Sequence, residues 1–539
     1  ADQAGNTSYA YSPKGELIQE TKVISGKTYV TSYQFDKNGN LQQTTYPSGR
    51  TVSYALDVAD RTTSVTTTPA GGSAQTLASS ISYKPFGGIA SLNYGNGLPR
   101  TVTYDQQYRI ASIVTGAVQN LAYTLDPNGN ITGITDNVNP TKNKSFGYDA
   151  LDRLASANGP WGALSWTYDP VGNRQTQVEN GATLTYSYET GTNKLTGVSG
   201  PSPLAFSFDA NGNTASENAK TFTYNQNNRL IKASESGTTK GEYTFNANGQ
   251  RGTKKTGSTT TVFHHDQQGN LIAETSTTGA TIAEYAWLES QPLAKVDSGG
   301  TRYVHTDHLG TPQIMTSSTG ATVWQIESKP FGDGASITGS ASLNLRFPGQ
   351  YYDGETGLHY NWNRFYMPAS GRYGSPDPFT LESAVYQDKV LLRLVLASFQ
   401  GDPSRLQWKR RALASLREWR SPLFEPHWVA WGASQGMHTD PADLHPFAYA
   451  DNAPTGIIDP FGLDGQGVTG GGLAISVGLG VLAGAAAGVG VIISSPALVA
   501  CGAVALVGVT VYEGYNAYKA GQNSINQYNS QIQSVEGGQ

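Results

Sequence analysis

One motif recurs through the first half of this 539-residue chain. Two aromatic residues with one residue between them are followed by Asp or Asn, then by a short polar stretch with Gly or Asp, then by Leu or Ile. Copies include "YQFDKNGNLQQT" from Tyr33, "YTLDPNGNITGI" from Tyr123, "FGYDALDRLASA" from Phe146 and "FTYNQNNRLIKA" from Phe222. Their spacing of roughly 20 residues lies in the range in which one supersecondary unit stacks on the next.

Each copy predicts a β-hairpin. The two aromatic rings share one face of a strand, because side chains alternate between the faces. Stretches such as "DPNGN" at 126–130 predict tight turns, since Asn and Gly tolerate positive φ. The same stretches faintly resemble calcium loops, but none supplies the alternating ligands and terminal Glu of an EF-hand, so a bare turn is favoured. One hairpin cannot bury its aromatic face, whereas a row can.

The composition agrees with an all-β fold. Only 14% of residues are charged, Gly is frequent at 63 residues, and Tyr outnumbers Phe by 30 to 16. A net charge of -5 argues against a general nucleic-acid-binding surface. The single cysteine, Cys501, excludes an intrachain disulfide. The chain begins inside the repeat pattern without a signal peptide, so we expect it to be a fragment or a product of a larger precursor.

The repeats resemble the YD repeats of the RHS family, the rearrangement-hotspot and teneurin group. A second set of motifs strengthens this resemblance: "YVHTDHLGTP", "GQYYDGETGLHYN" and "GRYGSPDP" match the RHS core signature. The resemblance extends to about Asp377 and resumes near His445. It implies one long antiparallel β-sheet that spirals into a hollow shell, an all-β cocoon.

The motifs divide the chain into five parts. A YD-repeat shell is expected at 1–300, a core-associated segment that closes it at 301–380, and a helical, partly basic insert at 381–444. The end of the core, with the motif "DPFGL", covers 445–463, and a Gly/Ala-rich apolar segment covers 464–539.

Two Asp-Pro pairs carry the chemistry that the resemblance implies. In self-cleaving members of the family, the aspartates of "GRY-x-S-x-DP" and "DPxGL" act as an intramolecular aspartic protease that cuts after the Leu. These aspartates are Asp377 and Asp459 here, and the bond is Leu463–Asp464. Two carboxylates held close together do not both ionise, so one can activate water while the other protonates the leaving amine.

Three points stay open from the sequence. About sixty residues intervene between Pro378 and His445, and they include another Asp-Pro at Asp440, so the partner of Asp459 is Asp377 or, as the less favoured alternative, Asp440. The insert could also have disabled cleavage. Arg372 is a candidate supporting residue that pairs with carboxylates or chain carbonyls, with a purely structural salt bridge as the alternative.

A third cluster, "HTDH", contains His305, Asp307 and His308. Three such residues could ligate a metal. On a strand, however, His305 and Asp307 share a side and His308 faces away, so a satisfied polar strand is favoured. No metal and no cofactor is expected.

The insert reads as two helices, the second with a basic run around Lys409, Arg410 and Arg411. Such a helix can bind a membrane surface, nucleic acid or a partner. A helical hairpin packed on the shell is favoured.

The last segment is apolar. Between Asp464 and Glu513 no residue is charged, and two Gly/Ala/Val-rich spans flank "SSP" at 494–496. They predict a helical hairpin that is long enough to insert into a membrane, the second span marginally, or one that is sheltered inside the shell. Cys501 is expected to be a packing residue. With no His after Leu463, the segment lacks an obvious catalytic set, so it is either a membrane-inserting effector or a translocation segment that precedes a toxin.

Two functions are consistent with these features. The first is a bacterial polymorphic-toxin shell that holds its own C-terminal effector and severs it by aspartyl self-cleavage. The resemblance then implies delivery into target cells by type VI secretion or a toxin complex, with an immunity protein as a possible partner. The apolar segment predicts contact with the target membrane, and the net charge gives no indication of nucleic acid. The second is a cell-surface adhesion protein anchored by the apolar hairpin, without cleavage.

Overall fold

The computed structural model describes residues 2, 4–85, 87–377, 447–462 and 466–467. Almost every element in these ranges is a β-strand. The predicted helical insert and the predicted apolar hairpin lie outside the described residues. No helix in the described ranges is both long enough and apolar enough to cross a membrane.

Thirty-two strands form one sheet in which each strand pairs antiparallel with the next strand in sequence, as the repeated hairpins predict. The first half comprises β1 (Asn6–Tyr11), β2 (Leu17–Ile24), β3 (Lys27–Phe35), β4 (Leu41–Thr45), β5 (Thr51–Leu56), β6 (Thr62–Thr68), β7 (Gln75–Tyr83), β8 (Ile89–Tyr94), β9 (Pro99–Tyr104), β10 (Ile110–Thr115), β11 (Gln119–Leu125), β12 (Ile131–Asp136), β13 (Lys144–Tyr148), β14 (Leu154–Gly159), β15 (Gly162–Tyr168) and β16 (Arg174–Glu179). A short 3-10 helix, η1 (Pro140–Lys142), precedes β13.

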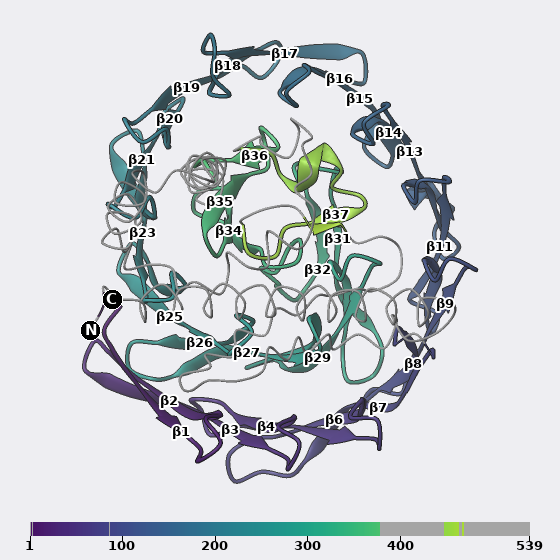
Figure 1. The fold of residues 1–539 in the computed structure, drawn as a ribbon, viewed down its shortest axis with the longest axis vertical. Coiled ribbons are helices and arrows are strands. Elements are labelled where there is room, and N and C mark those ends of the chain that lie inside the picture. The colour runs from purple at the N-terminus through teal and green to yellow at the C-terminus, as the bar shows by residue number, and fades with distance from the viewer. Residues whose placement is uncertain (1, 3, 86, 378–446, 463–465, 468–539) are drawn as a thin grey trace, which may run out of the picture.

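The second half of the sheet comprises β17 (Ala182–Tyr188), β18 (Leu195–Ser199), β19 (Leu204–Phe208), β20 (Thr214–Glu217), β21 (Lys220–Tyr224), β22 (Leu230–Glu235), β23 (Thr238–Phe245), β24 (Arg251–Thr256), β25 (Thr259–His265), β26 (Leu271–Ser276), β27 (Thr281–Leu288), β28 (Gln291–Asp297), β29 (Gly300–Thr306), β30 (Pro312–Thr316), β31 (Thr322–Glu327) and β32 (Ser336–Gly339). The sheet curls into a ring, and its last strands turn inside the first (Figure 1). The predicted spiralling, all-β shell is confirmed.

The aspartate of each repeat closes its own turn. In the turn between β11 and β12, the Asp126 carboxylate accepts hydrogen bonds from the backbone N–H of Asn130 at 2.9 Å and from its side-chain amide at 3.1 Å. Gly129 supplies the positive φ of 97° that this turn requires. The motif is therefore a self-capped hairpin turn.

The second aromatic residue of many repeats fastens one unit to the previous one. Tyr168 on β15, for example, donates its hydroxyl to the carbonyl of Leu154 on β14 at 2.8 Å. The same type of bond is made by Tyr83, Tyr104, Tyr148 and Tyr188. Neighbouring hairpins are thus joined by side chains as well as by the strand ladder.

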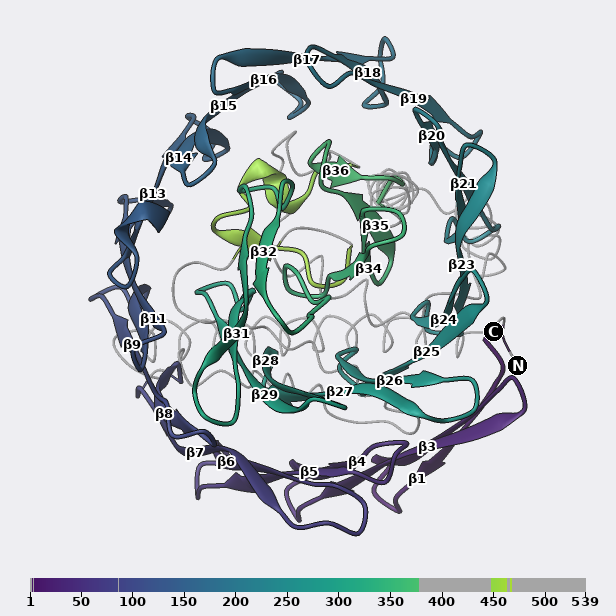
Figure 2. The same ribbon diagram turned by 180° about the vertical axis from the view of Figure 1, so that it is seen from behind.

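The ring closes where β4–β8 lie over β26–β29, a double layer that both views show (Figures 1 and 2). Apolar side chains from the two layers form one buried cluster that includes Val65, Leu77 and Leu293. Tyr46 donates its hydroxyl to the carbonyl of Tyr285 at 2.7 Å, and Tyr94 donates to Val304 at 3.1 Å. Burial of apolar surface between the layers therefore stabilises the closed spiral.

A second sheet lies inside the ring. It consists of β33 (Tyr351–Asp353), β34 (Leu358–Asn361), β35 (Arg364–Met367) and β36 (Arg372–Tyr373), all antiparallel. Its aromatic residues join those of β21–β27 in the largest buried cluster. We call this sheet the inner sheet.

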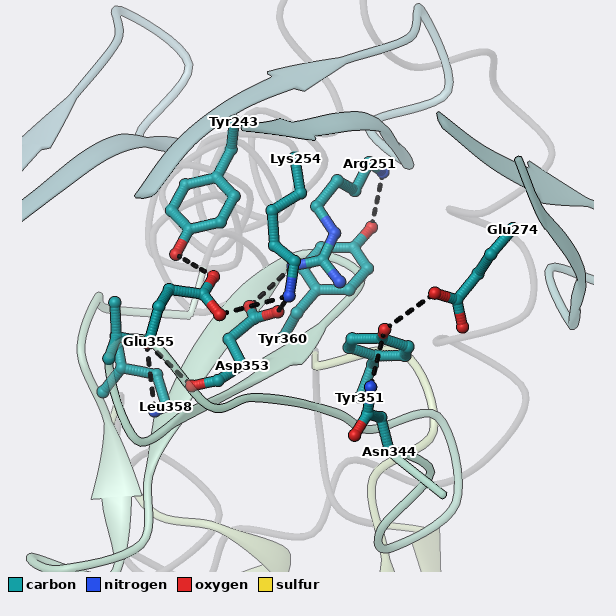
Figure 3. Close-up of polar contacts among 11 residues, drawn as sticks. Tyr243, Arg251, Lys254, Glu274, Asn344, Tyr351, Asp353, Glu355, Leu358 and Tyr360 are labelled. Carbon is teal, nitrogen blue, oxygen red and sulfur yellow. Dashed lines mark hydrogen bonds and ion pairs between the residues drawn. The ribbon is translucent and has the colours of Figure 1, made fainter. Parts of the chain in front are cut away.

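A buried charge network ties the inner sheet to the wall (Figure 3). Arg251 of β24 pairs with Asp353 of β33 at 2.6 Å, and both side chains are fully buried. Lys254 bridges Asp353 at 2.9 Å and Glu355 at 3.2 Å. The Arg251 guanidinium also lies over the ring of Phe263 at 4.3 Å. Because each buried charge has a partner, the network fixes the position of the inner sheet without leaving an isolated charge.

The described tail, 447–462, also lies inside the ring, beside the inner sheet (Figures 1 and 2). It contains the 3-10 turn η4 (Ala450–Asn452) and β37 (Ile457–Ile458), which pairs with β38 (Gln466–Gly467). Ala448 forms a bridge with Arg372 of β36, and Tyr449 packs on Tyr366 and Tyr373. The Thr455 carbonyl contacts the His308 ring nitrogen of the wall at 2.8 Å.

Candidate active site

Asp377 and Asp459 meet at one arginine. Asp377 follows β36, Asp459 follows β37, and each residue is only 1% exposed. The Arg364 side-chain nitrogen Nη2 lies 2.7 Å from Oδ2 of Asp377 and 3.0 Å from Oδ2 of Asp459. Arg364 opens β35, so the inner sheet places the cation between the two acids. The structure thus brings the two Asp-Pro aspartates together, whereas Asp440 lies outside the described residues.

Two neighbouring side chains hold Asp459. Tyr373 of β36 donates its hydroxyl to Oδ2 of Asp459 at 2.7 Å. Burial, followed by the charge of Asp459, raises the pKa of Tyr373 well above its usual value, so this hydroxyl keeps its proton and remains a donor. Asn361 of β34 donates to the Tyr373 hydroxyl and to the Asp459 carbonyl, both at 2.7 Å. The orientation of Asp459 is therefore set from its side chain and from its backbone.

The turn between β34 and β35 also binds the backbone that follows Asp459. The Arg364 Nε–H donates to the Gly462 carbonyl at 2.6 Å. Asn363 donates to the Phe461 carbonyl from its side chain at 2.9 Å and from its backbone at 3.2 Å. Gly462 is the residue before Leu463. The predicted cleavage bond, Leu463–Asp464, lies outside the described residues. Donors of one turn therefore hold successive carbonyls that lead up to this bond.

Two glycines permit this close approach. Gly462 has a φ of +62°, and a Cβ there would lie 2.3 Å from the Asn361 carbonyl oxygen. A Cβ on Gly349 would lie 1.9 Å from the carbonyl oxygen of Pro460. Any larger residue would push the tail away from the inner sheet, which explains the glycines of "DPFGL" and "FPGQYYD".

The predicted bond lies, in sequence, between two strands that pair with each other. Ile457 and Ile458 of β37 are opposite Gly467 and Gln466 of β38. A cut between residues 463 and 464 would therefore leave backbone pairing between the two resulting pieces.

Arg372, the predicted supporting residue, does not face the two aspartates. Its Nη2 donates to the Asn193 carbonyl of the wall at 2.5 Å, and its guanidinium lies over the Phe447 ring at 4.8 Å. It thus joins the wall, the inner sheet and the tail, through a chain carbonyl and an aromatic ring. Arg364, eight residues earlier, is the arginine that contacts both carboxylates.

Within "HTDH", β29 continues through Thr306, and Asp307 and His308 lie in the turn that follows rather than on the predicted strand. Asp307 caps this turn by accepting the backbone N–H groups of Leu309 and Thr311 at 2.9 and 3.0 Å, as the repeat aspartates do. His305, which is fully buried, contacts Thr316 Oγ1 at 2.8 Å, and burial lowers its pKa to about 3. His308 instead faces the tail. In the described part of the chain, no group of three or more potential metal ligands is found.

Sequence reasoning missed the polar residues between the aspartates. Arg364, Asn361 and Asn363 lie in "LHYNWNRFYM", and Tyr373 lies in "GRY". A signal was present, because three hydrogen-bonding residues interrupt an otherwise aromatic and apolar run. Buried polar groups need partners, so such an interruption indicates a network or a site.

The arrangement can support acid–base chemistry. Two buried carboxyl groups beside one guanidinium can exchange protons with a water molecule and a leaving amine. The guanidinium offsets the cost of burying negative charge, because it forms an ion pair with both acids and donates a hydrogen bond to Asp459. Fixed carbonyls next to the acids supply the positioning that an intramolecular reaction needs.

Comparisons with known proteins agree with this architecture. The teneurin YD-shell family model matches residues 118–391, just over half of the chain, and the RHS repeat matches 11–51 and 35–73. Toxin protein Tse5 of Pseudomonas aeruginosa is 37% identical over 102 residues, 19% of this chain and 8% of that protein. Toxin subunit YenC1 of Yersinia entomophaga is 25% identical over 448 residues, 66% of this chain and 45% of that protein.

A solved structure shares the fold. The crystal structure of TcdB2-TccC3 aligns with a TM-score of 0.64 at 18% identity, covering 86% of this chain and 24% of that one. This chain therefore spans less than half the length of each of these relatives. The repeated motif, the single spiralling sheet and the family match over half of its length show that the chain belongs to the RHS/YD-repeat, YD-shell family.

Proposed function

We propose that this chain is the shell portion of a bacterial toxin that cuts its own backbone after Leu463. The observation that carries the proposal is the pair of buried acids on Arg364, beside the held carbonyls of Phe461 and Gly462. The names of the relatives, a toxin protein and a toxin subunit, support the toxin role.

The reaction is a hydrolysis. A water oxygen adds to the carbonyl carbon of Leu463 while one aspartate takes a proton from that water. The bond to the Asp464 nitrogen then breaks, and the other aspartate gives the departing amine a proton. One water is consumed, and the proton count of the pair is restored. Asp377 and Asp459 are the two acids, and enclosure limits the reaction to a single bond.

The segment after the cut is the proposed cargo. Its apolar composition favours a membrane-inserting effector or a translocation segment, held by the shell until delivery into a target cell. Pairing of β37 with β38 across the bond supports retention after cleavage. A secretion apparatus or toxin complex and an immunity protein are the proposed partners.

Intact mass spectrometry and a denaturing gel test the proposal. The wild-type chain should give two pieces that meet at Leu463–Asp464, and the pieces should co-elute on size exclusion without denaturant. Asp459→Asn should give one intact chain. Two identical pieces from Asp459→Asn would refute the aspartyl mechanism. An intact wild-type chain that fractionates with membranes would instead favour the adhesion protein anchored by its apolar segment.

A further inference from the structure

One arginine of the wall reaches the turn that holds the tail. Arg229 lies in the turn before β22, and its Nη1 donates to the Trp362 carbonyl at 3.1 Å. Its Nη2 donates to Oδ1 of Asn363 at 2.6 Å. The partners are 133 and 134 residues away in sequence, so the contact exists only when the wall encloses the inner sheet.

Arginines at the same position of other repeats behave differently. Arg61, Arg109 and Arg153 each pair at 2.7 Å with the repeat aspartate four residues earlier. In "YNQNNR" that aspartate is replaced by Asn225, and Arg229 forms no ion pair with a described carboxylate. The substitution removes the local anion and leaves the guanidinium directed at the turn between β34 and β35.

The contact fixes how Asn363 can bind the tail. An asparagine side chain has one carbonyl oxygen and one amide nitrogen, which point in opposite directions. With Oδ1 bound by the charged Arg229, Nδ2 is directed to the Phe461 carbonyl, at 2.9 Å. Without Arg229, the side-chain amide of Asn363 could rotate and turn its Oδ1 toward the Phe461 carbonyl. The two oxygens would then repel each other.

Trp362 holds the same turn against the wall. Its φ of 43° is unusual for a bulky residue, and its indole N–H donates to the Asn248 carbonyl at 3.0 Å. Its ring meets that of Phe461 edge to face, with centroids 5.5 Å apart. The turn therefore lies between the wall on one side and the tail on the other.

We propose that Arg229 is a positioning residue for self-cleavage, acting through Asn363 on the Phe461 carbonyl. This inference rests on the proposed function. Its consequence is that the bond is presented to Asp377 and Asp459 only after the wall has wrapped around the inner sheet. Cleavage is thereby coupled to closure of the shell, and an unfinished shell stays uncut.

Cell-free synthesis of the full chain tests this coupling. Labelled protein is sampled over time into denaturant, and the fraction cut is measured on a gel, with the cut bond located by intact mass. Arg229→Ala and Asn363→Ala should each slow cleavage about 10- to 100-fold, the cost of a small misplacement near reacting atoms. The matched control Arg109→Ala, at the same repeat position, should cleave at the wild-type rate.

The double variant separates a positioning role from a general loss of stability. If the two residues act in series, Arg229→Ala with Asn363→Ala should be no slower than the slower single variant. Multiplied effects, or a wild-type cleavage rate in Arg229→Ala, would overturn the inference. If thermal melting shows that Arg229→Ala does not fold, Arg229→Lys and Asn363→Ala test the same contact between Arg229 and Asn363. Wild-type cleavage rates in both variants would overturn the inference. An uncut wild-type chain would refute the proposed function itself, and this inference with it.

Discussion

Aspartate has two different uses in the wall and at the inner site. In the wall, Asp126 accepts hydrogen bonds from its own turn, within four residues. At the inner site, Asp377 and Asp459 are buried and share Arg364 from a third segment. The same side chain is thus a local turn cap in one region and part of a long-range network in the other. Burial and the origin of the partners make the difference.

The largest effect should come from removing the acids. Asp377→Asn and Asp459→Asn should each reduce cleavage at least about 10³-fold, because an amide can neither accept nor supply the proton. Asp126→Asn, a wall variant, should leave cleavage unchanged. Gel quantification of the fraction cut checks all three variants. Loss of cleavage in Asp126→Asn would contradict the proposal that wall aspartates only cap turns while the inner aspartates carry out cleavage.

Next in size is the loss of the shared cation. Arg364→Met leaves two buried carboxyl groups without their guanidinium, and we expect about 3–5 kcal/mol of lost stability together with loss of cleavage. Arg61→Met removes a solvent-exposed pair with Asp57 and should cost less than about 1 kcal/mol. Urea midpoints measured side by side give the comparison, and equal losses would contradict it.

A buried histidine makes the inner layer sensitive to acid. His305 has its pKa lowered to about 3 by burial, so the unfolded chain binds its proton more readily than the folded chain does. The contribution of His305 to the free energy of unfolding is therefore fully present above about pH 6.5. It falls by about 1.4 kcal/mol per pH unit as the pH decreases toward 3. His305→Gln should reduce the slope of unfolding free energy against pH by about that amount. An unchanged slope would count against the neutral, buried state.

The smallest effects come from a matched pair of hydroxyl deletions. Tyr168→Phe removes one bond between wall hairpins and should cost about 1 kcal/mol of stability without changing cleavage. Tyr373→Phe removes the donor to Asp459 and should slow cleavage about 10-fold for a similar loss of stability. Thermal melts combined with cleavage time courses distinguish the two. Equal cleavage rates in Tyr168→Phe and Tyr373→Phe would show that the Tyr373 hydroxyl has only a structural role.

Local sequence rules predicted the wall well. The aromatic pairs, the Asp-capped turns and the glycines of the repeats act within a few residues, so their spacing alone indicated a long antiparallel sheet. Aspartates 377 and 459 were identified as candidate acids through the family resemblance, and the structure places them together. Their catalytic role remains a prediction, as do the helical insert and the membrane-active tail, which lie outside the described residues.

By itself, the sequence determined that the chain builds hairpins in series, because each turn contains its own hydrogen-bonding partners. Only the tertiary structure decided that Arg364 rather than Arg372 joins the acids, and that Arg229 reaches Asn363. Both arginines of the inner sheet are close to Asp377 in sequence and far from Asp459, but their side chains leave different strands, and only Arg364 contacts both carboxylates. Contacts between segments a hundred residues apart depend on how the spiral closes, and that closure comes from burial of surface along the whole sheet.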